Sequence, residues 1–372
     1  AYFESWYEPH QGLTQTLFEE LKGRKPEQDE SVPYEKNGYR YQWRFNAGDQ
    51  YRVWLRQSAT DDSEQWSTLL NENTLAEGCE YFRLGALAVS PDGTMLAYST
   101  ETNGSERFTL KVIDIASGEV LTTAIENCAG SVIWSADSHG FAYRLVNENW
   151  RPDRALYREL TSGEDTLLYQ EKDDSFFVGL GLSQSEQLMF ISSGDHVTSE
   201  VRFVPRDNLR AEQTLIATRR EGHEYDVEHQ GDDAKTGRLI IRSNRNHPNF
   251  DLFETPVATP EEVHWQILLP GDESHYLMGH VAFADALIVC LRINGLDQVQ
   301  IVDNSGSHLI EFPEPAYSVD LGTNPNYRTN ALRLAYTSMV TPHTVFDYHW
   351  QTKSLTRLKV QEIPGGYEAS DF

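Results

Sequence analysis

Leu87-Ala-Val-Ser-Pro-Asp-Gly-Thr-Met-Leu-Ala-Tyr-Ser99 is the stretch that decides the fold. A short apolar strand runs into the turn Ser90–Gly93, and a second strand begins after it. Proline presets φ in such a turn, while aspartate and glycine tolerate the backbone angles that reverse the chain. After a polar gap, Thr109–Asp114 alternates as a strand and Ala116–Glu119 forms another turn. The stretch therefore predicts an antiparallel meander.

The same pattern returns along the chain at a regular interval. The copies are spaced roughly 45–55 residues apart, which is the period of a four-stranded propeller blade. A β-sandwich would also show alternating strands, but not one turn pattern at a fixed period. The second strands of the copies are centred near Tyr41, Ala97, Ala142, Met189, Ile240, Val289 and Leu334. The sequence therefore predicts an all-β fold, a seven-bladed β-propeller.

The two ends of the chain do not follow the repeat. Near the start, an apolar stripe at helical spacing is followed by a glycine and a proline that would stop a helix. We expect residues 1–29 to form an N-terminal helical extension, residues 30–362 the propeller, and residues 363–372 a linker toward a further domain. The stripe and its stop signals are Leu13, Leu17, Phe18, Leu21, Gly23 and Pro26.

Composition limits the partners of the chain. Its 372 residues are 39% hydrophobic and carry a formal net charge of −26. Nucleic acid is not an expected partner, because phosphate binding needs a basic face. No membrane span is expected, because no apolar run approaches roughly 18–20 residues. The acidity is typical of a solvated surface, and it also allows attraction of peptides rich in lysine and arginine.

The cysteines and the first residues bear on the compartment. Cys79, Cys128 and Cys290 are far apart and odd in number, so neither a disulfide framework nor a zinc site is expected. Three buried free thiols favour a reducing cytoplasm. The segment Ala1–His10 has no basic region of the kind that starts a secretory signal.

Five separated motifs resemble the oligopeptidase B (protease II) branch of the prolyl oligopeptidase family of serine peptidases. They occur in the order expected of that family and cover nearly the whole chain. The most specific is Arg219–His229, because few unrelated propellers carry it. The others are Glu30–Tyr34, Asn149–Asp153, Asn330–Ser338 followed by Thr341-Pro342, and Ile363–Tyr367.

The resemblance implies a cytosolic enzyme that cleaves short peptides after arginine or lysine without a metal or cofactor. In that family an α/β-hydrolase domain holds the serine, aspartate and histidine, and the propeller caps it and gates the substrate. This sequence stops where that domain would begin, so the chain alone is expected to be inactive. One alternative is a stand-alone, non-catalytic propeller scaffold that binds proteins or peptides. Another is a propeller hydrolase with its own carboxylate pair, although no spacing singles one out.

No residue of this chain is assigned to catalysis, to a cofactor or to a metal. Gly181-Leu-Ser-Gln-Ser185 lacks the second glycine of a nucleophile elbow, and a strand follows where a helix is required. We interpret it as a turn between strands. The potential metal ligands between His223 and His229 are interpreted as structural, because on one straight strand these two histidines lie about 20 Å apart.

Two charged residues are predicted to contact the missing partner or its substrate. The resemblance places the stretches that contain Arg151 and Glu171 on neighbouring blade segments. The plain alternative for both is an ordinary solvated loop, which contributes little to stability.

Overall fold

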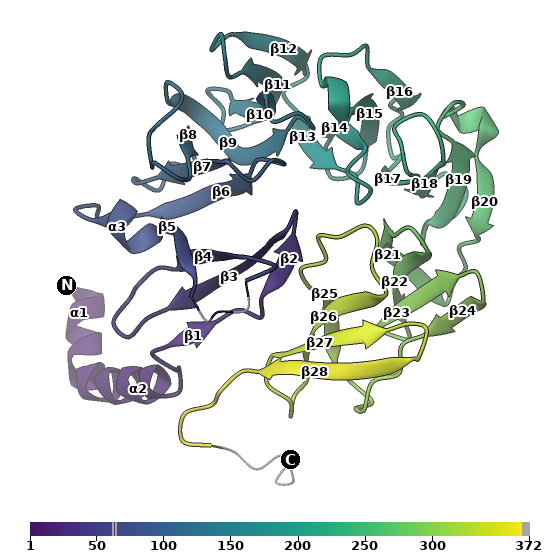
Figure 1. The fold of residues 1–372 in the computed structure, drawn as a ribbon. Helices are drawn as coiled ribbons and strands as arrows, with labels where there is room; N and C mark the ends of the chain where they lie inside the picture. The colour runs from purple at the N-terminus through teal and green to yellow at the C-terminus, as the bar shows by residue number, and fades with distance from the viewer. Residues whose placement is uncertain (62, 64, 367–372) are drawn as a thin grey trace.

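The structure, a computed structural model, describes residues 1–61, 63 and 65–366. Its β-sheets stand radially around a central axis, with the first strand of each unit nearest the axis and the last strand at the rim (Figure 1). This arrangement is a β-propeller, and the expected all-β class is confirmed.

The described residues form six sheets, in which neighbouring strands are antiparallel. The first sheet has five strands and is followed by the short helix α3 (Glu72–Ala76). Its strands are β1 (Asp29–Glu30), β2 (Tyr34–Lys36), β3 (Tyr39–Phe45), β4 (Val53–Ser58) and β5 (Ser67–Asn71).

The second sheet has seven strands, ordered along the sheet as they are along the chain. They are β6 (Arg83–Val89), β7 (Met95–Glu101), β8 (Phe108–Asp114), β9 (Ile125–Trp134), β10 (Gly140–Val146), β11 (Pro152–Glu159) and β12 (Asp165–Gln170).

The remaining four sheets have four strands each. The third contains β13 (Phe177–Leu182), β14 (Leu188–Gly194), β15 (Ser199–Pro205) and β16 (Thr214–Ala217), with the 3-10 helix η2 (Arg206–Asn208) after β15. The fourth contains β17 (Tyr225–Gln230), β18 (Arg238–Ser243), β19 (Asp251–Pro256) and β20 (Gln266–Leu269), with η3 (Glu262–His264) before β20. The fifth contains β21 (His275–Ala282), β22 (Ala286–Ile293), β23 (Leu296–Asp303) and β24 (Gly306–Leu309). The sixth contains β25 (Ser318–Leu321), β26 (Ala331–Thr337), β27 (Thr344–His349) and β28 (Ser354–Val360).

The prediction of seven separate four-stranded blades is wrong. Five of the six sheets in the described part of the chain are blade-sized, with four or five strands, and the other is one continuous seven-stranded sheet. The cause is β9, a long strand whose start pairs with β8 and whose remainder pairs with β10, so that Cys128 has a partner on both sides. A period counted between second strands cannot show where one sheet stops and the next begins.

The repeat does locate the second strands correctly. Each of the seven residues on which the count was based lies in a strand of the structure. At the turn that follows β6, the Ser90 hydroxyl accepts from Met95 N (2.9 Å), and Gly93 has φ +75°. A glycine tolerates this left-handed conformation without the cost that a Cβ would bring.

The core lies between the sheets, and the second strands supply much of it. On β18, Leu239 and Ile241 pack toward the preceding sheet, while Ile240 between them packs toward the following one. Alternate residues of a strand point to opposite faces, so one fully buried strand serves two neighbouring cores. Truncating such a leucine or isoleucine to alanine costs about 2–5 kcal/mol.

The ring closes between the first and last sheets without a shared strand among the described residues. Side chains join them instead. The Arg333 guanidinium donates to Pro33 O (2.7 Å), and Lys359 pairs with Asp29 (2.5 Å). The closure of the propeller therefore depends on a few polar contacts at this seam.

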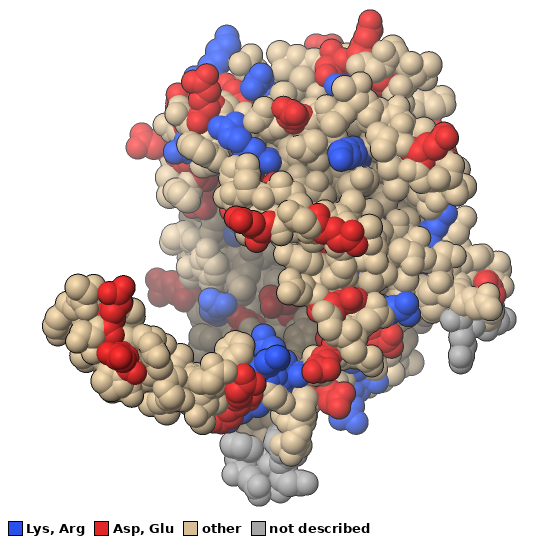
Figure 2. All heavy atoms as spheres, turned by 90° about the vertical axis from the view of Figure 1, so that its left-hand side faces the viewer, with Lys and Arg blue, Asp and Glu red and all other residues tan. Residues whose placement is uncertain are grey.

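The N-terminal segment is helical, as expected, and forms α1 (Tyr2–Tyr7), η1 (Glu8–His10) and α2 (Gln11–Gly23). None of its residues is buried, and it stands out from the body of the molecule as an arm (Figure 2). The apolar stripe of α2 therefore has no cover in this chain. The boundaries 1–29, 30–362 and 363–372 remain predictions, and residues 367–372 of the expected linker lie outside the described residues.

No helix within the described ranges is long and apolar enough to cross a membrane.

Because the strands alternate in direction, the ring has two different ends. We call the turn end the one at which the first strand of a unit meets its second strand. We call the loop end the one at which first strands begin and second strands meet third strands. Asp29 of β1 pairs with the last residue of β3, and Val360 of β28 pairs with the first residue of β27. Both the helical arm and the C-terminal segment therefore leave the ring at the loop end.

Candidate functional site

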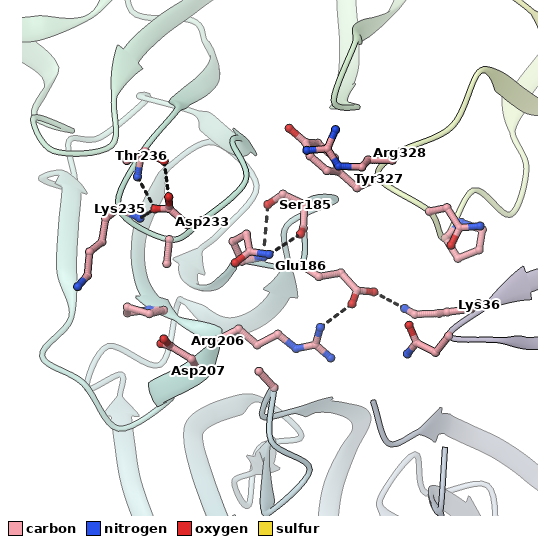
Figure 3. Close-up of a pocket in the computed structure, with 17 residues that line it drawn as sticks. Lys36, Ser185, Glu186, Arg206, Asp207, Asp233, Lys235, Thr236, Tyr327 and Arg328 are labelled. Carbon is pink, nitrogen blue, oxygen red and sulfur yellow. Dashed lines mark hydrogen bonds and ion pairs between the residues drawn. The ribbon is translucent and has the colours of Figure 1, made fainter. Parts of the chain in front are cut away.

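The turn end of the axis holds a pocket of about 760 Å³ (Figure 3). Residues from several sheets surround it, because the connections between first and second strands converge there. Charged side chains of both signs line it, namely Lys36, Glu186, Arg206, Asp207, Asp233, Lys235 and Arg328. The pocket therefore has no strong preference for one sign of charge.

Most of these charges are already paired. The Glu186 carboxylate lies between Lys36 and Arg206, with Arg206 Nη1 at 2.5 Å (Figure 3). Burial alone would raise the pKa of Glu186, but the two cations outweigh it and hold the pKa below its usual value. Arg206 also donates to Trp134 O (3.1 Å), so the network joins three sheets.

A serine and a histidine meet beside this pocket. Ser185 Oγ lies 2.6 Å from His229 Nδ1. Such a distance would let a histidine act as the base of a serine nucleophile. The other ring nitrogen, Nε2, faces Thr236 O at 3.1 Å instead of a carboxylate. His229 is fully buried, and burial lowers its pKa. The pair therefore braces the turn between β13 and β14, as the sequence predicted for Gly181–Ser185, and it has no group in the third position of a triad.

The histidines of the Arg219–His229 motif have structural contacts. His223 Nε2 lies 2.8 Å from Ser243 Oγ, and its ring stacks on Tyr225 at 5.1 Å. Asp226 pairs with Arg242 (2.6 Å). These contacts agree with the turn and strand role expected from the sequence.

A second cavity, of about 550 Å³, runs along β13 and β17, the strands nearest the axis in their sheets. Glu228 lines it and accepts from Gln184 N (2.9 Å) and His229 N (2.7 Å). Burial raises the pKa of Glu228 to about 7, and the two backbone donors oppose this only in part. The sequence placed Glu228 only among the residues interpreted as structural between His223 and His229, and it gave no sign of the raised pKa, because the burial of this carboxyl follows from the packing of distant strands.

Glu171 lies at the loop end, in the connection between β12 and β13. Its carboxylate accepts from Arg219 and from Ser193 Oγ (both 2.5 Å), and Tyr169 OH lies at 3.1 Å. Burial would raise its pKa, but the Arg219 and Ser193 contacts lower the pKa to about 2. This carboxylate is therefore used inside the chain and is not a free surface charge.

Arg151 lies at the other side of the same connection. Its guanidinium stacks on the ring of Phe177 (4.5 Å), and Arg219 stacks on Phe176 (3.9 Å). The structure thus brings Arg151 and Glu171 to the two ends of one connection: Glu171 begins it, and Arg151 stacks on Phe177, the first residue of β13.

Large exposed apolar side chains occur at both ends of the ring: six lie at the loop end, while Val120, Leu121 and Val263 lie in connections between third and fourth strands at the turn end, away from the axis. Trp150 is 60% exposed and Met339 is 96% exposed. Around the axis at the turn end, the first connections of the sheets expose no large apolar side chain in the described part of the chain. The loop-end group comprises Tyr81, Trp150, Phe177, Val197, Tyr276 and Met339.

The three cysteines are free, but they are not equally buried. Cys128 is buried and Cys290 is half-buried, and burial raises the pKa of both thiols. Cys79 is exposed, so the prediction of three buried thiols is wrong at this position.

A family model and several curated proteins are similar to this chain over its whole length or nearly so. Residues 1–361 match the family model described as prolyl oligopeptidase, N-terminal beta-propeller domain. The chain is 30% identical to dipeptidyl aminopeptidase BI of Pseudoxanthomonas mexicana and 30% identical to protease 2 of Moraxella lacunata. Each alignment covers 100% of this chain and, respectively, 53% and 54% of the relative. The chain therefore spans about half the length of these curated relatives.

A solved structure is also similar to this chain and is also about twice its length. Oligopeptidase B of Trypanosoma brucei is similar with a TM-score of 0.91 and 25% identity, over 99% of this chain and 53% of that one.

Proposed function

Because this chain belongs to the prolyl oligopeptidase family, as its N-terminal β-propeller domain, we propose that it is the propeller half of a serine peptidase that cuts short peptides after arginine or lysine. Similarity to oligopeptidase B and to protease 2 supports this substrate class. The nucleophile, its base and its acid would lie in an α/β-hydrolase domain beyond residue 372. The chain by itself would have no peptidase activity.

The observation that carries the proposal is the contrast between the two ends of the ring. At the loop end, the arm and the C-terminal segment leave the ring, and six large apolar side chains are exposed. Exposed apolar groups at the end from which both terminal segments leave favour that end as the surface that another domain covers. We propose that the hydrolase domain covers this end and that the arm packs on it.

Arg151 and Glu171 have different parts in this proposal. Arg151 is half-buried beside Phe177, and the part of its side chain that stays exposed could reach the hydrolase domain or a bound peptide. Glu171 is held by Arg219 and Ser193, so it would act by fixing the shape of the Glu171–Phe176 loop. The net charge of −26 would attract peptides that carry arginine or lysine, and the free thiols are consistent with a cytoplasmic site of action.

The test is to express this chain and a longer version that continues into the following coding sequence. Both are assayed with peptides that carry a fluorogenic group after arginine, lysine or proline, with the N-terminus blocked or free. The free N-terminus tests the dipeptidyl cleavage named for one relative. We expect activity only in the longer protein, on blocked peptides after arginine or lysine, and a rate that falls with salt.

Activity in this chain alone would contradict the proposal. A natural stop codon after Phe372, with peptide binding but no hydrolysis, would instead favour a non-catalytic scaffold.

A further inference from the structure

The connection between β25 and β26, residues 322–330, differs from the corresponding turns of the other sheets. It is long, and it extends from its own sheet toward the axis at the turn end, where Pro325–Arg328 line the 760 Å³ pocket. The Asn324 side chain fixes its base by donating to Gly322 O and Arg333 O (both 2.9 Å) and accepting from Arg333 N (2.7 Å). We call residues 322–330 the axial segment.

The axial segment contacts four other sheets. Asn326 Nδ2 donates to Glu35 O of β2 (3.0 Å), and Arg328 pairs with Asp232 in the connection after β17. Tyr327 O accepts from Ala284 N in the connection after β21 (3.1 Å). In addition, Gln184, in the connection after β13, donates from Nε2 to Asn324 O (2.7 Å). A loop tied to four neighbours at once has little freedom to move aside.

Gln184 and Asn324 mark a boundary inside the ring. Gln184 N is held by Glu228, which lines the 550 Å³ cavity, while the next residue, Ser185, lines the 760 Å³ pocket. Among the described residues these two cavities share no lining residue. The Gln184–Asn324 hydrogen bond therefore lies where the outer pocket ends and the inner cavity begins.

We propose that the axial segment is a fixed plug of the turn end, so that peptides reach the interior of the propeller only from the loop end. The plug makes the axial space a chamber with one mouth, and it limits the length of peptide that the chamber can hold. This inference rests on the proposed peptidase function for its substrate, but not for its geometry.

The first test locks the plug. In the longer protein, Arg328→Cys and Asp232→Cys are combined in a Cys79→Ser background, because Cys79 is exposed, and are joined by a short bis-maleimide. Arg328 and Asp232 are both exposed, so the reagent can reach them. We expect kcat/KM for a short arginine peptide to stay within about twofold of the unjoined protein. A loss of tenfold or more on cross-linking would show that the segment must open, and would overturn the proposal.

The second test removes the plug. Pro325–Arg328 is replaced by two glycines, which keeps Asn324 and Thr329 at the base of the segment. We expect kcat/KM for a long peptide, relative to a short one, to rise several-fold because the chamber gains a second opening. The control is Arg210→Ala, which removes an exposed arginine paired with Glu159 and outside the axial segment. An unchanged ratio in a variant that unfolds like wild type would overturn the proposal.

The third measurement needs no activity and uses this chain. Amide hydrogen exchange is followed at Ala284 and Arg333, whose N–H groups donate to Tyr327 O and Asn324 Oδ1 of the axial segment. Exchange at these two amides as slow as in β22 and β26 is expected for a fixed plug. Fast exchange would overturn the plug even if the longer protein is a peptidase. Slow exchange in this chain, together with no peptide cleavage by the longer protein, would refute the proposed function but not the fixed plug.

Discussion

The turn end and the loop end of this propeller are built from the same sheets, yet they differ in how their polar and apolar groups are satisfied. At the turn end, Glu186 is paired with two cations, and Gln184 reaches Asn324 of a distant sheet. At the loop end, Trp150 and Met339 are exposed to solvent. The arm also leaves from there with its apolar stripe uncovered.

This difference bears on which end of the ring has groups left for a partner to contact. A pocket in which most of the lining charges are already paired inside the chain has fewer charges left for a partner to bind. A face with exposed aromatic and aliphatic groups gains free energy when it is covered, about 25 cal/mol per Å² of apolar surface. This difference supports our proposal that the loop end, and not the axial pocket at the turn end, receives a second domain.

The largest effect is expected from Arg206→Ala at the turn end. The Arg206 side chain is 10% exposed and holds Glu186 and Trp134 O, so its removal leaves a partly buried carboxylate with only Lys36. We expect the free energy of unfolding to fall by about 4 kcal/mol, measured by urea denaturation. The control is Arg210→Ala, for which a loss below about 1 kcal/mol is expected. Equal losses in the two variants would remove the distinction between a locked network and an ordinary surface pair.

Glu171→Gln tests whether a charged network at the loop end also stabilises the propeller. The carboxylate has a pKa of about 2, below its ordinary value of 4.5, so its stabilisation is present above pH 4.5 and is lost as the pH falls toward 2. At neutral pH we expect the variant to be about 3 kcal/mol less stable. The gap should close in acid, as followed by denaturation at several pH values. A gap that does not depend on pH would contradict the assigned charge of Glu171.

Glu228→Gln tests the raised pKa of the carboxyl that holds Gln184 N, where the two cavities meet. A carboxyl whose folded pKa is raised to about 7 contributes stability that is fully present below pH 4.5 and is lost as the pH rises through 7. The amide keeps an acceptor for Gln184 N and His229 N at every pH. We expect the variant to gain about 1–2 kcal/mol over wild type between about pH 5 and pH 8. A difference between the proteins that stays constant over this range would refute the raised pKa.

The smallest effect is expected from Trp150→Ala at the loop end. The indole donates to Ser105 O (2.8 Å) and stacks with Arg107 (5.0 Å), but it is mostly in solvent. We expect a change of about 0.5 kcal/mol in the stability of this chain, measured as for Arg206→Ala. A loss above about 2 kcal/mol in the free energy of unfolding would mean that Trp150 stabilises the propeller itself. It would then count against the proposal that its exposed ring is there to contact another domain.

Local sequence patterns were sufficient for some features of the site. Ser90–Gly93 predicted its turn, and the absence of a second glycine in Gly181–Ser185 favoured a turn between strands over a nucleophile elbow, because these features depend on residues a few positions apart. The roles of Arg151 and Glu171 were predicted only by resemblance and stay predictions. The resemblance gave no sign that Arg219 and Ser193 hold Glu171, since both lie more than twenty positions away.

Local pattern and period thus determined on their own that this chain is a ring of antiparallel meanders with a helical segment at its start. Tertiary structure alone decided that β9 pairs on both sides and joins two units into one sheet, which corrects the count of blades. It also decided that Gln184 meets Asn324 across the ring. The physical reason is the same in both cases: hydrogen bonds between remote strands and loops form only after the chain has closed around its axis, and no pattern of neighbouring residues encodes them.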